Sequence, residues 1–167
     1  MKSKLRAVFT VVVGFVVATG WLCAHHSDAV YDQTTLKIIK GTVRQHMLVN
    51  PHQVIKLRVQ GADGRYTAWT LIGANVSSNR AVGWTKETLQ VGDPITAWGF
   101  AYRDGKPNMT WMRIVKELDG RMLPISGNKN DKLARFLSKY GKDQMSQEEY
   151  EVFERSINWV EENNPRQ

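Results

Sequence analysis

The stretch Leu36-Lys37-Ile38-Ile39-Lys40-Gly41-Thr42-Val43-Arg44-Gln45-His46-Met47-Leu48-Val49 decides the fold. It is rich in β-branched residues and predicts one long strand. Leu36 and Ile38 alternate at even positions, whereas the apolar set that begins at Val43 falls at odd positions. The inward phase should therefore change near Gly41, where a bulge costs least. A long first strand that bends at a glycine is typical of small closed barrels.

Strand patterns recur further along the chain, with turn residues between them. Asp-Gly pairs at 63–64 and 104–105 predict hairpins between neighbouring strands. The expected elements are strands at 55–59, 66–72, 95–102 and 109–118, with a short serine-capped helix at 77–82. This order predicts a mainly β fold, a small five-stranded OB-like barrel with a short helix between strands 3 and 4. A plain β-sandwich is the alternative.

The C-terminal part, residues 126–167, changes from strand periodicity to helix periodicity. Apolar residues from Leu133 to Tyr140 follow the spacing i, i+3, i+4, i+7, and a Ser-x-x-Glu capping box stands at 146–149. We therefore expect a linker followed by an α-helical hairpin tail. Its apolar stripe either packs on the barrel or on itself, or docks a protein partner through residues 131–162.

The N-terminus has the charge and apolar order of an export signal. Lys2, Lys4 and Arg6 precede the apolar run Ala7 to Ala24. We expect residues 1–24 to be a signal peptide, which predicts a periplasmic or secreted protein. The alternative is an uncleaved anchor in the inner membrane that faces the periplasm, because the run is close to the length of a membrane-spanning helix. Only in that case would the membrane be a partner.

Cleavage of this segment affects both charge and domain limits. The small-residue rule allows cleavage at Ala18-Thr19-Gly20 or at Leu22-Cys23-Ala24. Removal of residues 1–24 deletes three positive and no negative charges, so the net charge falls from +7 to +4. The barrel domain should then span residues 25–125. Because Cys23 is the only cysteine, an internal disulfide and a cysteine-based zinc site are excluded.

Motifs of common enzyme classes are missing from the sequence. It contains no Gly-x-Ser-x-Gly elbow, no phosphate-binding glycine loop and no His-Glu-x-x-His helix. The acidic residues gather in the tail, where they have the pattern of a solvated helix face. A binding module fits these features better than an enzyme, although copper-dependent redox chemistry is not excluded.

The four histidines lie between His25 and His52 and suggest a metal site. Imidazole nitrogens suit copper and zinc, and His25, His26 and His52 supply three of them. In an alternative pair, His46 and His52 would both face outward across the first hairpin. The structural alternatives are that His52 hydrogen-bonds the backbone of its Asn-Pro-His turn and that His25 and His26 belong to a flexible leader.

A second hypothesis is the binding of an extended ligand, an oligosaccharide or an oligonucleotide, by an aromatic and basic barrel face. The candidate residues are Trp69, Trp84, Arg44, Lys56 and Arg58. The tryptophans at 69, 84, 98 and 111 also fit the core, since they stand in strands or beside the helix. Export and a net charge of only +4 make nucleic acid a poor candidate.

Several short motifs together resemble an exported bacterial family known as domain of unknown function 6152. The matching pieces are Ala24-His25-His26-Ser27, Val49-Asn50-Pro51-His52, Gly83-Trp84-Thr85, Gly92-Asp93, Asp104-Gly105 and Asp119-Gly120-Arg121. The resemblance spans about residues 24–125 and leaves out the tail. It implies export, an OB-like barrel and a shared role for the two histidine segments, and it brings no established activity.

Overall fold

The computed structural model describes residues 29–125, 133, 135–137, 139, 143–148 and 150–151. The chain divides into two units, Met1–Val30 and Tyr31–Gln167, and the second holds the folded domain. The predicted signal peptide lies outside the described residues. Within the described part, no helix is long and apolar enough to cross a membrane.

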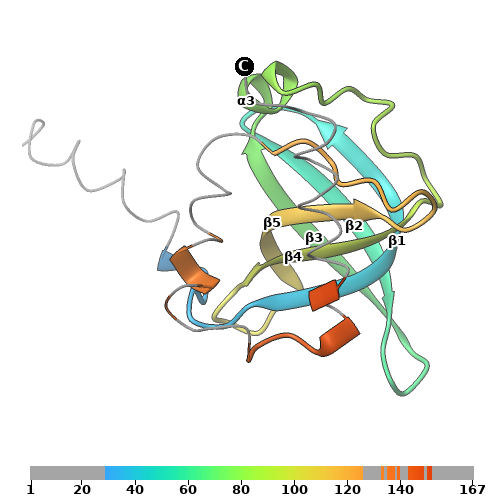
Figure 1. The fold of residues 1–167 in the computed structure, drawn as a ribbon. Coiled ribbons are helices and arrows are strands. Elements are labelled where there is room, and N and C mark those ends of the chain that lie inside the picture. Colours follow the sequence, from blue (N-terminus) through green and yellow to red (C-terminus); the bar gives the residue numbers. More distant parts are fainter. Residues whose placement is uncertain are drawn as a thin grey trace, which may run out of the picture. The chain divides into compact units, whose positions relative to one another are not determined.

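The domain is a closed barrel with the strand order β1-β2-β3-β5-β4 (Figure 1). β1 pairs with both β2 and β4 and so closes the barrel, while β3 and β5 run parallel. The elements are β1 Lys37–Leu48, β2 His52–Gln60, β3 Tyr66–Asn75, α3 Val76–Ala81, β4 Pro94–Ala101 and β5 Asn108–Lys116. This is the arrangement of an OB barrel, so the mainly β, five-stranded prediction is confirmed and the β-sandwich alternative is set aside.

β1 is long enough to pair with β4 over its first half and with β2 over its second half. Thr42 is the junction, because it pairs with Pro94 of β4 and with Arg58 of β2. A register shift between Val43 and Gln45 marks a bulge just after this junction. The extra residue is Arg44, so the phase change predicted at Gly41 is wrong by three residues. The predicted sense is wrong as well, because inward residues are odd-numbered before the bulge and even-numbered after it. The bulge reverses the side-chain phase of the rest of the strand.

Gly41 has a different role from the one expected. A Cβ atom built on Gly41 would lie 2.9 Å from the carbonyl oxygen of Arg58 and 3.0 Å from Cγ2 of Val59. Only glycine allows β1 to approach β2 this closely at the point where it leaves β4. The glycine thus provides the close approach, and the bulge provides the change of phase.

Two apolar clusters stabilise the domain. The first fills the barrel and includes Trp84 and Trp111, and the second lies outside it around Trp98. All three tryptophan side chains are buried, which confirms their interpretation as core residues. The second cluster contains Tyr31, Leu36, Trp98, Phe100, Met112, Val115, Met122, Leu133 and Phe136.

Part of the C-terminal tail packs on the barrel. Leu133 and Phe136 are buried in the second cluster, and the rings of Phe136 and Phe100 lie 5.4 Å apart. The backbone N–H of Leu36 donates to Oε1 of Gln144, with N···O 3.2 Å. The described tail residues thus pack as predicted for the apolar stripe. The remainder of the predicted helical hairpin lies outside the described residues.

Helix α3 lies between β3 and β4, at one end of the barrel (Figure 1). Its N-cap is Asn75, whose side-chain oxygen accepts from the N–H of Ser78 at 2.8 Å. The serine cap predicted for residues 77–82 is wrong, since the helix begins one residue earlier. Asn75 is also the last residue of β3, so strand and helix are joined without a loop.

Candidate ligand-binding face

The charged residues of β1, β2 and β3 are all cationic. These three strands contain no aspartate or glutamate, and they contain five cationic residues, Lys37, Lys40, Arg44, Lys56 and Arg58. Lys40 pairs with Glu148 of the tail at 3.2 Å. Among the residues that the structure describes, the other four cations form no ion pair. Lys37 shares the inward phase of Ile39 and Val43, so four of the five cations stand on the outward side of these strands, which we call the β1–β3 face.

The strand register aligns polar residues across this face. Arg58 pairs with Thr42 on one side and Ala68 on the other, and Lys56 pairs with Gln45 and Thr70 in the same way. All of them stand on the outward phase, because the alternate residues of β2 are buried. Successive outward residues on a strand lie ~7 Å apart, so the face presents its charges as a regular row.

One aromatic ring is exposed on this face. Tyr66 is 57% exposed, and the guanidinium carbon of Arg58 lies 4.6 Å from the centre of its ring. This cation–π contact holds the arginine flat against the tyrosine. The pair offers both a ring face and a planar charge to a ligand at the hairpin end of β2 and β3.

The predicted ligand residues divide into surface and core positions. Arg44, Lys56 and Arg58 are exposed, and Trp69 is half-buried with the ammonium of Lys37 at 5.9 Å from its ring centre. Trp84 is only 1% exposed. Its indole N–H donates to the carbonyl of Pro124 at 2.7 Å. The prediction that Trp84 contacts a ligand is therefore wrong, since α3 and the following loop bury it against the barrel interior.

The predicted histidine site is only partly described. His52 is exposed at the start of β2, directly after the cis Asn50–Pro51 peptide, and it pairs with Asn75. His25 and His26 lie outside the described residues. The described ranges contain no group of three or more histidine, cysteine, aspartate or glutamate residues that could hold a metal ion.

His46 does not face outward with His52, so the alternative outward pair is wrong. It lies opposite Ile55 on the inward phase, because the Arg44 bulge reverses the rest of β1. Its ring is half-buried and packs edge-on to Trp84, with the ring centres 5.4 Å apart.

His46 belongs to a buried chain of hydrogen bonds inside the barrel. Asn79 Nδ2 donates to Oε1 of Gln53 at 2.8 Å and to the carbonyl of Ala74 at 3.3 Å. These bonds fix the Gln53 amide so that its Nε2 faces Nε2 of His46 at 2.9 Å. The amide N–H must donate there, so this ring nitrogen accepts and the imidazole is neutral.

Burial strengthens the same preference. Removal of the His46 ring from water lowers its pKa below 6.5, and the carbonyls of Lys86 and Leu89 oppose this only in part. Sequence reasoning missed Gln53 and Asn79. Gln53 could have been found from the β2 alternation, since it shares its parity with the inward Ile55 and Leu57.

The Gly92-Asp93 motif fastens β1 at its bulge. The N–H of Gly92 donates to the carbonyl of Val43, and the N–H of Val43 donates to the carbonyl of Asp93, both at 2.9 Å. The carboxylate of Asp93 lies 2.9 Å from the ammonium of Lys116, and the two side chains are 11% and 14% exposed. Burial opposes the ionisation of Asp93, yet the N–H of Gln90 and the Lys116 ammonium hold its pKa below the usual value.

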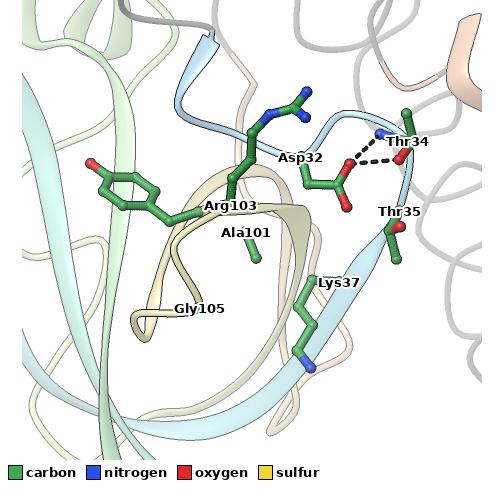
Figure 2. Close-up of a pocket in the computed structure, with 8 residues that line it drawn as sticks. Asp32, Thr34, Thr35, Lys37, Ala101, Arg103 and Gly105 are labelled. Carbon is green, nitrogen blue, oxygen red and sulfur yellow. Dashed lines mark hydrogen bonds between the residues drawn. The ribbon is translucent and has the colours of Figure 1, made fainter.

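A pocket of about 450 Å³ lies where the chain enters the barrel (Figure 2). Its lining comes from the segment before β1, from the first residue of β1 and from the loop between β4 and β5. The lining residues are Asp32, Thr34, Thr35, Lys37, Ala101, Tyr102, Arg103 and Gly105. Sequence reasoning used Gly105 as a turn residue and assigned no binding role to this set.

Comparison with known proteins identifies the family. The model of a family of unknown function, DUF6152, matches residues 14–111. The chain belongs to the DUF6152 family. The resemblance inferred from the short motifs is thereby confirmed, and the matched DUF6152 segment includes the whole β1–β3 face and the buried chain from His46 to Asn79. No curated protein matches the chain.

Several solved structures are similar to this DUF6152 member at low identity. A small single-stranded DNA-binding protein from Streptomyces coelicolor is 18% identical, with a TM-score of 0.39 over 52% of this chain and 94% of that one. The second single-stranded DNA-binding protein of Mycobacterium smegmatis is 16% identical, with a TM-score of 0.35 over 52% and 91%. A mitochondrial single-stranded DNA-binding protein from S. cerevisiae is 13% identical, with a TM-score of 0.34 over 56% and 98%.

Proposed function

We propose that this domain is a non-catalytic binding module that holds an extended anionic ligand across the β1–β3 face. One observation carries the proposal. The outward side of three adjacent strands carries four cations and no acidic residue, and three of those cations, Arg44, Lys56 and Arg58, lack an ion pair among the described residues. A surface of one sign raises the local concentration of ligands of the opposite sign. The β2–β3 side is also where OB barrels bind oligosaccharides and oligonucleotides.

The ligand class that we propose is an acidic oligosaccharide. Binders of single-stranded nucleic acid rely on several exposed rings on which successive bases stack. Here Trp84, Trp98 and Trp111 are buried and Trp69 is half-buried, so Tyr66 is the main exposed ring of the β1–β3 face. A row of cations beside a single ring suits a chain of charged sugars better than a run of bases. The export that we predict from residues 1–24 would bring the protein into contact with such polymers.

The expected affinity is modest and depends on salt. Each exposed charge contributes little by itself, and salt at physiological strength screens charges over ~8 Å. The affinity should therefore come from several cations that act together on one polymer. It should fall when salt is added and when two neighbouring cations are removed.

A copper or zinc site at His25, His26 and His52 is our second proposal. The observation that favours it is the exposure of His52, whose ring stands at the surface of the turn rather than in the core. A neutral imidazole in that position is accessible to a metal ion. This proposal includes the periplasmic or secreted location predicted from the sequence, because export and signal cleavage would leave His25 and His26 near a new N-terminus.

The experiment that tests the first proposal is a titration of the mature protein with defined polymers. Acidic galacturonate oligomers, neutral galactose oligomers and a single-stranded oligodeoxythymidine would be compared by calorimetry at low and physiological salt. The Lys56→Ala/Arg58→Ala variant should bind the acidic oligomer at least tenfold more weakly. The control Lys86→Ala/Arg121→Ala removes the same charge outside β1–β3 and should bind normally.

The outcomes of this titration are decisive. Equal binding of acidic and neutral oligomers would overturn the proposal, as would equal losses in the two double variants. Tighter binding of the oligodeoxythymidine than of the galacturonate oligomer would keep the face and replace the ligand class.

A further inference from the structure

The pocket beside the chain entrance has the size and lining of a small-molecule site. Its volume of about 450 Å³ falls inside the range of ~300–1,000 Å³ that is typical of ligand pockets. It is distinct from the outward row of β2, because its walls come from 32–37 and 101–105. Lys37 lines the pocket from the inward phase of β1, where its ammonium lies 5.9 Å from the ring centre of Trp69, the inward partner of Leu57.

Asp32 is held in one orientation by the two threonines that follow it, since hydrogen bonds from the side chains of Thr34 and Thr35 both lower the pKa of its carboxyl group. The backbone N–H and the hydroxyl of Thr34 both donate to Oδ1, at 3.0 and 2.6 Å. In Figure 2 both dashed lines end on that oxygen, and the second oxygen points away from Thr34 toward the side of Lys37 and Thr35. A fixed carboxylate with an oxygen turned into a pocket is an acceptor for a ligand hydroxyl group.

A hydrogen bond to the backbone holds the side chain of Arg103 in place. Its Nε donates to the carbonyl of Tyr31 at 3.0 Å, and Tyr31 in turn packs edge-on to Tyr102 with ring centres 5.0 Å apart. Within the described residues the terminal nitrogens of Arg103 make no hydrogen bond. They keep the planar fork that matches a carboxylate. In Figure 2 Arg103 and Lys37 extend away from each other, on opposite sides of Asp32.

The charges of the lining select the class of ligand. Lys37 and Arg103 against Asp32 leave one net positive charge, which a single carboxylate balances. A phosphate, with a charge of about −1.5 to −2, would exceed that balance and would meet the fixed Asp32 carboxylate. Thr35 and Asp32 require a ligand with hydroxyl groups. A hydroxylated monocarboxylate satisfies both conditions.

We propose that this pocket binds one uronate unit, with its carboxylate on Arg103 and its ring hydroxyls on Asp32 and Thr35. The inference rests on the proposed function, because it makes the pocket the place where one sugar of an acidic oligosaccharide is recognised. The row of cations supplies attraction along the polymer, and the pocket supplies selection for a single residue of it.

The test uses free galacturonate as the probe and the mature full chain as the protein. Binding would be measured by NMR titration, with galactose as the neutral counterpart. Wild-type protein should bind galacturonate at least tenfold more tightly than galactose. Arg103→Gln and Asp32→Asn should each weaken galacturonate binding at least tenfold, and Thr35→Val should weaken it severalfold.

Controls separate the pocket from the fold and from the face. Thermal unfolding would show whether Asp32→Asn, which alters the turn with Thr34, still folds; Thr35→Val keeps that turn and tests the same site. The Lys56→Ala/Arg58→Ala variant should bind the monosaccharide normally. Galacturonate binding that Arg103→Gln leaves unchanged, or equal binding of galactose, would overturn the proposal.

The two proposals fail in different ways. If wild-type protein binds the galacturonate oligomer and not the monosaccharide, the pocket inference is wrong and the face proposal stands. If it binds the monosaccharide through Arg103 while Lys56→Ala/Arg58→Ala leaves oligomer binding unchanged, the face proposal is wrong and the pocket stands.

Discussion

The side-chain amide of Asn79 donates to Oε1 of Gln53 at 2.8 Å, and both side chains are fully buried. This bond joins α3 to β2 and decides which end of the Gln53 amide faces His46. It makes the helix part of the interior hydrogen bonding as well as a cover over the barrel end.

Asn79→Ala should destabilise the protein by about 1–3 kcal/mol, because it leaves the buried Oε1 of Gln53 without a donor. Urea unfolding followed by tryptophan fluorescence measures the change. Arg80→Ala, at the exposed neighbour on α3, should cost less than about 0.5 kcal/mol. Equal losses in the two variants would show that the buried bond is unimportant.

Stability should decrease as the pH falls below about 6.5, the usual pKa of histidine. The folded state lowers the pKa of His46, mainly through burial, so near this pH the unfolded chain binds more protons than the folded one. The stabilisation is thus fully present above 6.5 and is lost as the pH drops toward the lowered folded value. Urea unfolding between pH 7.5 and 5.5 tests this dependence.

The matched variants for this pH series are His46→Phe and His52→Ala. The first should flatten the dependence in this window, and the second, which changes an exposed histidine, should keep it. A wild-type slope that survives in His46→Phe would assign the effect to another group.

Lys116→Met should cost about 3 kcal/mol of stability, since it leaves the mostly buried carboxylate of Asp93 without its cation. Asp93→Asn/Lys116→Met removes both charges and should recover part of that loss. A double-mutant cycle in urea gives the coupling energy. Additive effects would mean that the pair contributes nothing beyond its separate packing.

His52→Ala should weaken copper or zinc binding at least tenfold if the proposed histidine site exists. The measurement is a metal titration of the mature protein, with its N-terminus established by mass spectrometry. His46→Gln is the control, because the ring at 46 lies on the inward phase and should not take part. Unchanged affinity in His52→Ala would remove this residue from any metal site.

Alternation and turn residues were sufficient to predict the barrel. The β2 pattern follows from burial on one side, and the Asp-Gly pairs at 63–64 and 104–105 stand in the turns between strands, with Gly64 and Gly105 at positive φ. The start of β1 contacts apolar clusters on both of its sides, so its pattern did not show which set of residues faces inward. Because Leu36 and Ile38 were taken as the inward set, His46 was placed on the wrong side of the barrel.

The candidate site was predicted less completely than the fold. Arg44, Lys56 and Arg58 could be assigned to the surface from β-strand parity, whereas the burial of Trp84 depends on a loop that has no periodicity. The pocket at Arg103 could not be anticipated, since it brings together residues that are about 70 positions apart in the chain. Such proximity depends on how β4 returns beside the start of β1.

The tail residues Leu133 and Phe136 cover the outer side of β4 against Phe100, so this side of the barrel is not exposed to solvent. The tail also reaches one cation of the β1–β3 face, since Glu148 pairs with Lys40, whereas Arg44, Lys56 and Arg58 are exposed and accessible to a polymer. A version cut after Ile125 would keep every strand and every cation of the β1–β3 face, yet it would expose a second, apolar surface. Such a shortened protein should self-associate, so binding measurements on it would report aggregation rather than ligand recognition.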